Sequence, residues 1–141
     1  MDSLNKLVCV GLELSFWDDV KDGLQAALDV DHNKYTLDDI KSALDAQKMQ
    51  LWGVHDGILR CVFITQVCNY PNARVLECIG LHGKDPAQWI QLILESMDAY
   101  ARETNCDLME TGGRRGWEKM FKQHGWGNSR LRMSKRIDYG K

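Results

Sequence analysis

The chain has 141 residues, 44% hydrophobic and 27% charged, which are ordinary values for one globular domain spanning residues 1–141. This composition excludes a disordered chain, and the longest apolar runs are too short to cross a membrane. The first residues are polar and acidic, so we expect no secretory signal peptide and a cytoplasmic location. Five cysteines without a CxxC pair indicate buried free thiols rather than a disulfide framework or a zinc site.

The net charge of −2 is the average of two oppositely charged parts of the chain. Residues 1–112 carry 9 basic and 18 acidic side chains, a net charge of −9, whereas residues 113–141 carry 9 basic and 2 acidic side chains, a net charge of +7. Two interpretations stay open. The basic part forms a surface for an anionic ligand or partner, or it packs beside the acidic part of the same fold.

The first third of the chain predicts one strand and two helices. Residues 4–14 are typical of a strand, and apolar side chains at helical spacing indicate a helix over residues 16–29. Ser15 and Thr36 are each followed three residues later by an aspartate, the spacing of a capping box, so we expect each to begin a helix. The expected buried side of the second helix comprises Leu37, Ile40, Leu44 and Met49.

The middle of the chain predicts three strands, over residues 51–54, 58–68 and 73–81. The turn at His55-Asp56-Gly57 joins the first two strands, because Asp-Gly tolerates positive φ, and Asn69-Tyr70-Pro71-Asn72 joins the second to the third. Since the connections are short, we expect an antiparallel meander.

The last third predicts a long helix, a strand, a short helix and a final strand. Asp85 is expected to cap the long helix, with Pro86 in its first turn. A strand over residues 106–111, a helix over 117–124 and a strand over 131–137 follow.

This order of elements resembles the fold of the GNAT family, the acetyl-coenzyme A-dependent N-acetyltransferases, over nearly the whole chain. The segment Gly113-Arg114-Arg115-Gly116-Trp117, followed by Phe121 and Gly125-Trp126, is similar to a GR-x-GW…G-aromatic signature of small GNAT-like proteins encoded by tailed phages and prophages. Trp89 near the start of the long helix and Tyr100-Ala101 near its end belong to the same resemblance. It implies an α+β fold with a mixed central sheet of about six strands and helices on both faces.

The resemblance also implies where a cofactor would bind. Active members hold the cofactor's pyrophosphate at the start of the long helix, on a glycine-rich loop whose N–H groups approach the phosphates. Here Pro86 removes one backbone donor and the carboxylate of Asp85 repels a second anion, although Lys84 offsets part of this. We therefore expect no cofactor; if the chain is an active enzyme, the cofactor is acetyl-CoA. In that case the cofactor-binding residues would be His82, Gly83, Lys84, Arg114 and Arg115.

For proton transfer, the resemblance implies a glutamate base near the middle strands and a tyrosine acid on the last helix. Phe121 stands at the tyrosine position and has no hydroxyl to donate a proton. Glu77 is the best candidate base, since it alternates with Val75, Ile79 and Leu81 on one side of its strand, and partial burial would make it more basic.

Some of these candidate residues have a purely structural alternative. Glu77 is favoured to pair with Arg60 or Arg74 across the sheet rather than to act as a base. Residues 112–115 are favoured to make a tight turn in which Arg114 binds a carboxylate such as Glu110, although glycines and arginines before a helix can also bind a phosphate.

The basic end of the chain predicts a partner surface. Its residues are Lys119, Lys122, Arg130, Arg132 and Arg136. Such a surface can contact nucleic acid through phosphates, but no base-reading motif accompanies it. The four histidines lie in separate segments without metal-ligand spacing, so we expect no metal site.

The missing cofactor loop and the missing acid favour a catalytically degenerate GNAT-fold protein. The resemblance points to a structural or assembly component of a virion, either tail-associated or internal, because related folds in short-tailed phages have that association. Such a protein would be in the host cytoplasm during assembly and then in the particle, in contact with other virion proteins or copies of itself. The alternative is an active acetyl-CoA-dependent N-acetyltransferase with a non-standard cofactor loop.

Overall fold

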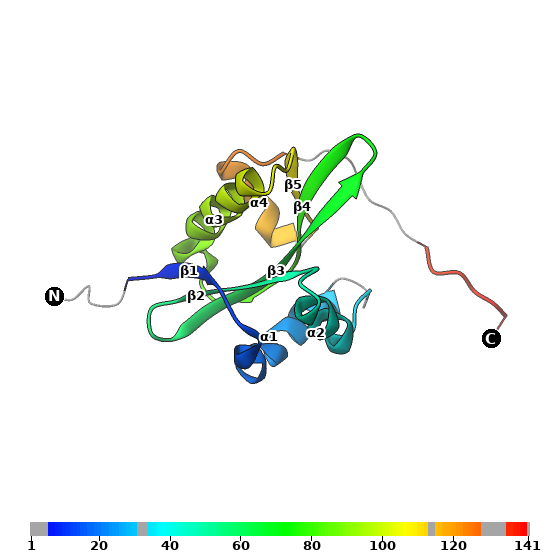
Figure 1. Cartoon of the computed structure of the whole chain (residues 1–141), viewed down its shortest axis with the longest axis horizontal. Helices are drawn as coiled ribbons and strands as arrows, with labels where there is room; N and C mark the ends of the chain where they lie inside the picture. The colour runs from blue at the N-terminus through cyan, green and yellow to red at the C-terminus, as the bar shows by residue number, and fades with distance from the viewer. Residues whose placement is uncertain (1–5, 31–33, 113–114, 128–134, 141) are drawn as a thin grey trace.

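The computed structural model describes residues 6–30, 34–112, 115–127 and 135–140 (Figure 1). These residues contain one five-stranded sheet, in the order β1-β2-β3-β4-β5. The strands are β1 (Val8–Gly11), β2 (Gln50–His55), β3 (Leu59–Tyr70), β4 (Ala73–Gly83) and β5 (Leu108–Thr111). Each of the first four strands pairs antiparallel with the next one along the chain, and β5 pairs parallel with β4. The predicted meander and the mixed sheet of an α+β fold are therefore confirmed.

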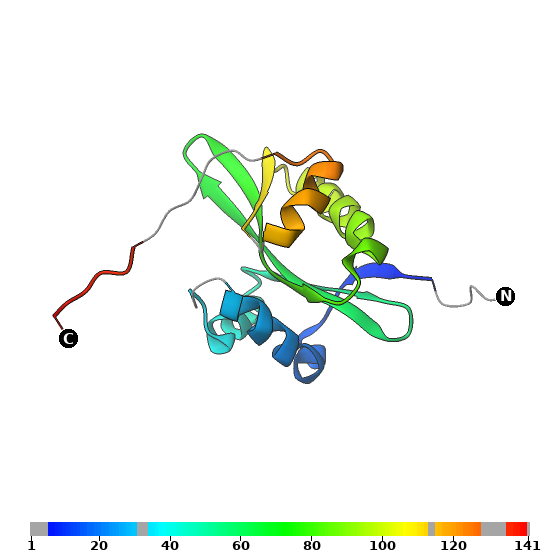
Figure 2. The same cartoon turned by 180° about the vertical axis from the view of Figure 1, so that it is seen from behind.

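The helices lie on both faces of this sheet, as predicted. They are the α-helices α1 (Trp17–Val30), α2 (Leu37–Asp45), α3 (Ile90–Glu103) and α4 (Arg115–Gln123), and the 3-10 turns η1 (Leu14–Phe16) and η2 (Pro86–Gln88). Figures 1 and 2 show α1 and α2 on one face of the sheet and α3 and α4 on the other.

Each face of the sheet has its own apolar core. The buried residues of the α3 core are Val54, Cys61, Phe63, Leu76, Cys78, Trp89, Ile90, Ile93, Leu94, Met97, Ala101 and Phe121. Those of the α1 core are Val20, Leu24, Leu28, Ile40, Met49, Leu51, Val62 and Ile64. β3 supplies side chains to both cores, which explains why five consecutive residues, 61–65, are buried and why its sequence is apolar without alternation.

The two predicted capping boxes have different outcomes. At α2 the Asp39 N–H donates to Thr36 Oγ1 at 3.1 Å, and the Thr36 N–H donates to Asp39 Oδ2 at 2.9 Å, so this box is confirmed. The prediction for Ser15 is wrong. Ser15 lies inside η1, which precedes α1 directly, so the chain enters the helix through a tighter turn instead of a side-chain cap.

The start of the long helix also differs from the prediction. Asp85 makes no side-chain cap hydrogen bond, and its backbone is left-handed, with φ of 55°. η2 intervenes, and α3 begins at Ile90 instead of beside Asp85. Pro86, whose fixed φ suits a first helical position, starts η2.

The sheet has five strands in the described residues where about six were predicted. Of the expected last strand, residues 131–134 lie outside the described residues, and residues 135–137 form no strand. Among the helices that the structure describes, none combines the length and apolar character needed to cross a membrane.

Candidate functional site

The parallel pair of β4 and the edge strand β5 is short. β4 and β5 pair from Val75 opposite Leu108 to Cys78 opposite Thr111, where β5 ends. β4 continues to Gly83 against β3 alone. Beyond Cys78, the edge of β4 has no strand partner on the β5 side in the described residues.

A β-bulge lies at this point. Thr65 pairs with Cys78 and Ile64 pairs with Gly80, so Ile79 is the extra residue on β4. Cys78 packs in the α3 core, Ile79 packs against the α1 core, and Leu81 packs against the α3 core again. Glu77 and Ile79 therefore lie on the same side of the sheet, as predicted, whereas Leu81 lies on the other side, because strict alternation does not pass through a bulge.

Glu77 lies on the α1 side of the sheet. Its Oε1 accepts a hydrogen bond of 3.0 Å from Gln66 Nε2, and the same amide lies 3.5 Å from the hydroxyl of Tyr35, a residue packed against the α1 core. The residue opposite Glu77 on β5 is Glu110, so two carboxylates are neighbours here. Burial, together with the nearby charge of Glu77, raises the pKa of the Cys68 thiol.

The predicted arginine partners of Glu77 are wrong. Arg60 pairs with Asp56 at 3.0 Å in the turn between β2 and β3, where the two lie four residues apart. Arg74 donates to the side chain of Asn69 at 2.7 Å and to the carbonyl of Thr104 at 2.8 Å. Both guanidinium groups therefore bind acceptors other than Glu77, and the hydrogen-bond partner of Glu77 is a neutral amide.

Phe121, at the position where the resemblance implies an acid, belongs to the α3 core. It is 7% exposed, and its ring meets that of Trp126 edge-on at 5.0 Å between centroids. Phe121 and Glu77 thus lie on opposite sides of the sheet. No proton donor and acceptor pair is formed by these two positions.

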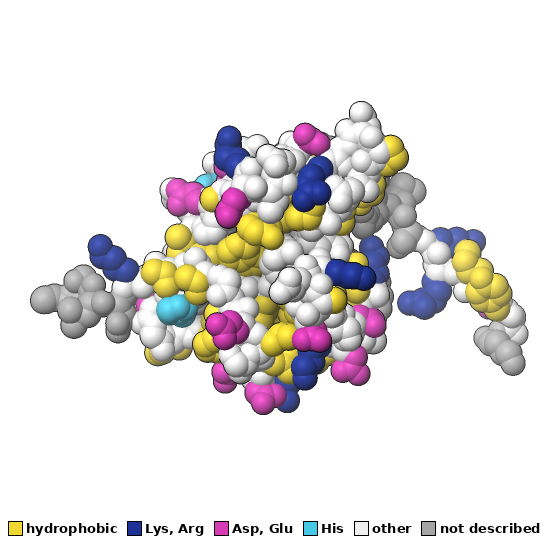
Figure 3. Space-filling model, in the orientation of Figure 1, with side chains coloured by type: hydrophobic (Ala, Val, Ile, Leu, Met, Phe, Trp, Pro, Cys, Tyr) yellow, Lys and Arg dark blue, Asp and Glu magenta, His cyan; other side chains and the backbone are white. Residues whose placement is uncertain are grey.

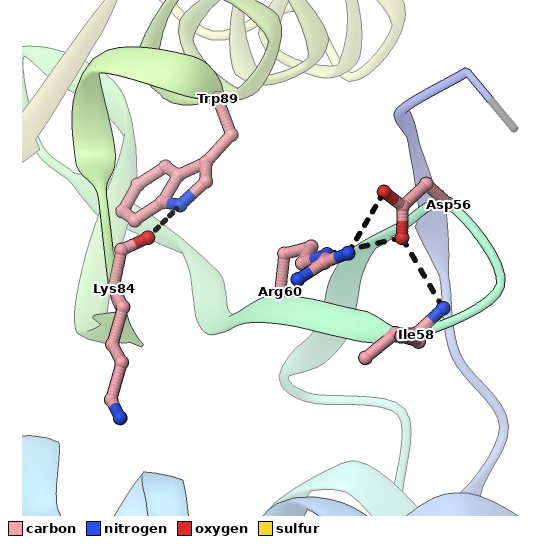
Figure 4. A network of polar contacts seen from close by, with 5 residues as sticks. All are labelled: Asp56, Ile58, Arg60, Lys84 and Trp89. Atoms are coloured by element: carbon pink, nitrogen blue, oxygen red, sulfur yellow. Dashed lines mark hydrogen bonds and ion pairs between the residues drawn. The ribbon is translucent and has the colours of Figure 1, made fainter. Parts of the chain in front are cut away.

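The turn before α3 is closed by its own hydrogen bonds. The N–H of Gln88 donates to the carbonyl of Asp85 at 3.0 Å, and the N–H of Trp89 donates to the carbonyl of Pro86 at 3.1 Å. The indole N–H of Trp89 donates to the carbonyl of Lys84 at 2.7 Å (Figure 4). These bonds use donors that an anion would otherwise need.

Trp89 fills the space beneath this turn. Its side chain is 1% exposed, and its ring lies 5.7 Å from that of Trp117 at the start of α4. A Cβ on Gly83 would stand 2.7 Å from the carbonyl oxygen of Arg60 and 3.0 Å from Cζ2 of Trp89, so only glycine fits there. The glycine in this segment serves indole packing as well as the close approach of β3 and β4.

Two of the predicted cofactor-binding residues, His82 and Gly83, face opposite sides of the sheet. A Cβ on Gly23 would lie 2.9 Å from Cδ2 of His82, so the imidazole packs against α1, whereas Gly83 faces Trp89 on the other side of the sheet. The side chain of Lys84 points away from the indole (Figure 4). Arg114 lies outside the described residues, and Arg115 is the first residue of α4.

The predicted partner surface is only partly within the described residues. Lys119 is exposed, and Lys122 forms an ion pair of 3.3 Å with Glu118 one helical turn earlier. Arg136 is exposed in a stretch without regular structure, and Arg130 and Arg132 lie outside the described residues.

The remaining predictions concern thiols and metals. All five cysteines are free, as predicted, but only Cys61 and Cys78 are buried. Burial raises the pKa of Cys78 to about 12, which makes this thiol inert. In the part of the chain that the structure describes, no three His, Cys, Asp or Glu side chains are grouped as metal ligands.

One surface feature was missed by the sequence reasoning. A groove of about 580 Å³ lies between α3, β5 and the segment after α4, and it contains none of the predicted cofactor-binding residues. Its lining includes Leu94, Glu95, Asp98, Arg102, Met109 and Trp126. The only signal in the sequence is the polar stripe of α3 at helical spacing, which any exposed helix has.

No protein-family model matches the chain, and no curated protein matches its sequence. Solved structures do resemble it. A GCN5-related N-acetyltransferase from Ralstonia eutropha JMP134 has a TM-score of 0.76 at 14% identity, covering 94% of this chain and 99% of that one. A predicted acetyltransferase from Clostridium acetobutylicum, solved with acetyl-CoA, has a TM-score of 0.75 at 9% identity, covering 93% and 96%.

A ribosomal-protein-alanine N-acetyltransferase from Brucella melitensis biovar Abortus 2308 has a TM-score of 0.71 at 13% identity, covering 94% of this chain and 100% of that one. Identities this low establish a shared fold and no shared activity. The order of the elements, the parallel pairing of β4 with β5 and these likenesses lead to one conclusion: the chain has the GNAT fold.

Proposed function

We propose that the chain is a GNAT-fold protein that has lost the acetyltransferase reaction and serves as a structural or assembly component of a phage particle. The observation that carries this proposal is the closed turn before α3. Pro86 has no N–H, and the N–H groups of Gln88 and Trp89 donate within the turn. A pyrophosphate binds at a helix start through several backbone donors, and two donors of this turn, the N–H groups of Gln88 and Trp89, are already engaged.

The acid and base positions support the same proposal. Acetyl transfer needs a group that takes a proton from the amine and a group that protonates the leaving thiolate, both close to the reacting atoms. Phe121 has no proton to give and is buried in the α3 core. Glu77 lies on the other side of the sheet, hydrogen-bonded to Gln66.

A protein without catalytic activity performs its role by binding partners at its surface. The resemblance to small phage-encoded GNAT-like proteins, together with net charges of −9 and +7 in the two parts of the chain, supports contacts with other virion proteins or with copies of itself. The basic end can also contact nucleic acid phosphates, through Lys119, Lys122, Arg130, Arg132 and Arg136. The location that fits is the host cytoplasm during assembly, followed by the particle.

The test of the virion role is the protein content of purified particles. Quantitative mass spectrometry of particles produced in the host is expected to find this chain in a fixed copy number relative to the other virion proteins. Presence in the infected cell together with absence from the particle would overturn the virion role. The same preparation from a deletion strain is the control, and its particles are expected to be defective in assembly or infection.

One observation favours a second candidate function, an active acetyl-CoA-dependent N-acetyltransferase. The pairing of β4 with β5 ends at Cys78, next to a bulge at Ile79, and the Clostridium protein of the same fold was solved with acetyl-CoA. In this case Glu77 would be the base, and Lys84 with the arginines near residues 114–115 would hold the phosphates. Release of free coenzyme A in the presence of amine acceptors, lost in Glu77→Gln, would establish this candidate and refute the first.

A further inference from the structure

β1 is an edge strand without the features that normally prevent edge-to-edge pairing. It is first in the strand order, and its residues, Val8 to Gly11, include no charge and no proline. Val8 is 40% exposed and Val10 is 37% exposed, both large for strand valines. The strand therefore presents an apolar side that meets water.

The backbone of β1 has donors and acceptors directed away from the sheet. The N–H of Leu12 donates to the carbonyl of Leu51 at 2.8 Å, on the β2 side. Because N–H groups alternate in direction along a strand, those of Cys9 and Gly11 point outward. Among the described residues, the sheet partner of β1 is β2 alone.

The apolar surface continues from β1 onto the adjacent hairpin. Ile58 is 62% exposed and Leu59 is 38% exposed at the turn between β2 and β3. Leu12 and Leu59 meet over Gly53, since a Cβ there would lie 2.7 and 3.0 Å from their Cδ1 atoms. Figure 3 shows hydrophobic side chains on the surface beside the N-terminal end of the chain.

We infer that β1 pairs antiparallel with β1 of a second copy, across a twofold axis at Cys9, and joins the two five-stranded sheets into one. In this register the outward backbone groups of Cys9 pair with those of Cys9 of the second copy, and those of Leu7 pair with Gly11. Val8 stands opposite Val10 of the second copy in a non-hydrogen-bonded pair, where side chains approach most closely. Both exposed valines of each copy become covered.

The ends of β1 indicate that the occupant is a second copy. Lys6 precedes the strand and Glu13 follows it, and both side chains are exposed. Antiparallel self-pairing brings the basic end of each strand beside the acidic end of the other, and it makes an isologous contact that closes as a dimer. The inference concerns the edge of the sheet, so it holds whether or not the chain binds acetyl-CoA.

The contact area sets the expected strength. The surface area buried by one short strand pair with its flanking valines and leucines is below about 1,200 Å² in total, at the low end for specific interfaces. We therefore expect a weak dimer, with a dissociation constant of about 10–500 µM. Sedimentation velocity on the full chain from about 1 µM to about 1 mM is expected to show monomer turning into dimer. A monomer at every concentration would overturn the inference.

Substitutions in the valine pair test the register. Val8→Lys/Val10→Lys places like charges opposite each other and is expected to weaken the dimer at least about tenfold. Val8→Lys/Val10→Glu instead places a lysine of one copy across from a glutamate of the other. Its dimer is expected to be about tenfold tighter than that of Val8→Lys/Val10→Lys. Leu108→Lys, on the other edge strand with 43% exposure in the wild type, is the matched control and should leave the dimer unchanged.

Two further readouts keep the test independent of folding defects. Circular dichroism must show the same fold for all variants, and the amide hydrogens of Cys9 and Gly11 are expected to exchange more slowly as the concentration of the wild-type chain rises. A dimer that is insensitive to both valine variants, or amides that exchange at the same rate at every concentration, would mean that β1 is not the interface.

Discussion

Trp89 is the residue whose replacement tests the packing at the start of α3 most sharply. Its side chain is 1% exposed, its indole N–H bonds the carbonyl of Lys84 at 2.7 Å, and its ring lies 5.7 Å from that of Trp117. Trp89→Ala removes all three, so we expect the free energy of unfolding to fall by about 3–5 kcal/mol. Trp89→Phe keeps most of the ring and loses the hydrogen bond, so we expect about 1–2 kcal/mol.

Equilibrium unfolding in urea, followed by far-ultraviolet circular dichroism, measures both losses. Trp17→Phe is the matched control, because Trp17 is half-buried on the other side of the sheet, and we expect a change below about 1 kcal/mol. A double-mutant cycle with Trp117→Leu should give a coupling of about 0.5–1.5 kcal/mol between the two rings. If Trp89→Ala costs less than about 1 kcal/mol, the indole does not fix the turn and the reasoning fails.

Four other substitutions have defined outcomes. Gly83→Ala places a Cβ 2.7 Å from the carbonyl of Arg60, so we expect a loss of about 1–3 kcal/mol in urea unfolding, whereas Gly112→Ala meets nothing within 4 Å and should change stability by less than about 0.5 kcal/mol. Thr36→Ala removes a confirmed cap and should cost about 1 kcal/mol at neutral pH. The backbone N–H of Thr36, and then its hydroxyl, lower the pKa of Asp39, so the stabilisation by the Asp39 carboxylate is present above the ordinary carboxyl pKa of about 4 and is lost as the pH falls through the lower folded value. The stability difference between the wild type and Asp39→Asn should therefore shrink below about pH 4 in an acid titration of stability. Glu77→Gln removes one cause of the raised pKa of Cys68, so alkylation of Cys68, followed by peptide mass spectrometry, should become faster at a given alkaline pH, and an unchanged rate would contradict the placement of Glu77.

Most of the fold follows from local patterns in the sequence. The period of the apolar residues located α1, α2 and α3, and the change of period after Met49 located the meander. Thr36 was identified as a cap because its partner, Asp39, is only three residues away. Ser15 and Asp85 have the same local chemistry, yet a 3-10 turn replaced the side-chain cap at both places. At Asp85, the burial of Trp89 directly after the 3-10 turn accounts for the difference.

The candidate site was less predictable because it depends on which side of a strand each residue faces. The bulge at Ile79 changes the alternation along β4, and no residue type in that segment marks a bulge. The partner of Glu77 is Gln66, eleven residues away across a hairpin, and arginines were preferred over it only because charge pairs are the stronger contact. The lack of a proton donor at position 121 could be predicted without a structure, because phenylalanine has no hydroxyl.

The measurement that tests the central claim most directly is a calorimetric titration of the full chain with acetyl-CoA, up to about 1 mM ligand. The closed turn before α3 predicts no binding heat, for the wild type and for Lys84→Glu alike. Lys84→Glu is the informative control, since its side chain would contact phosphates and makes no contact with Trp89 that the fold needs (Figure 4). Micromolar binding by the wild type that disappears in Lys84→Glu would show that the cofactor site is intact and would contradict the account.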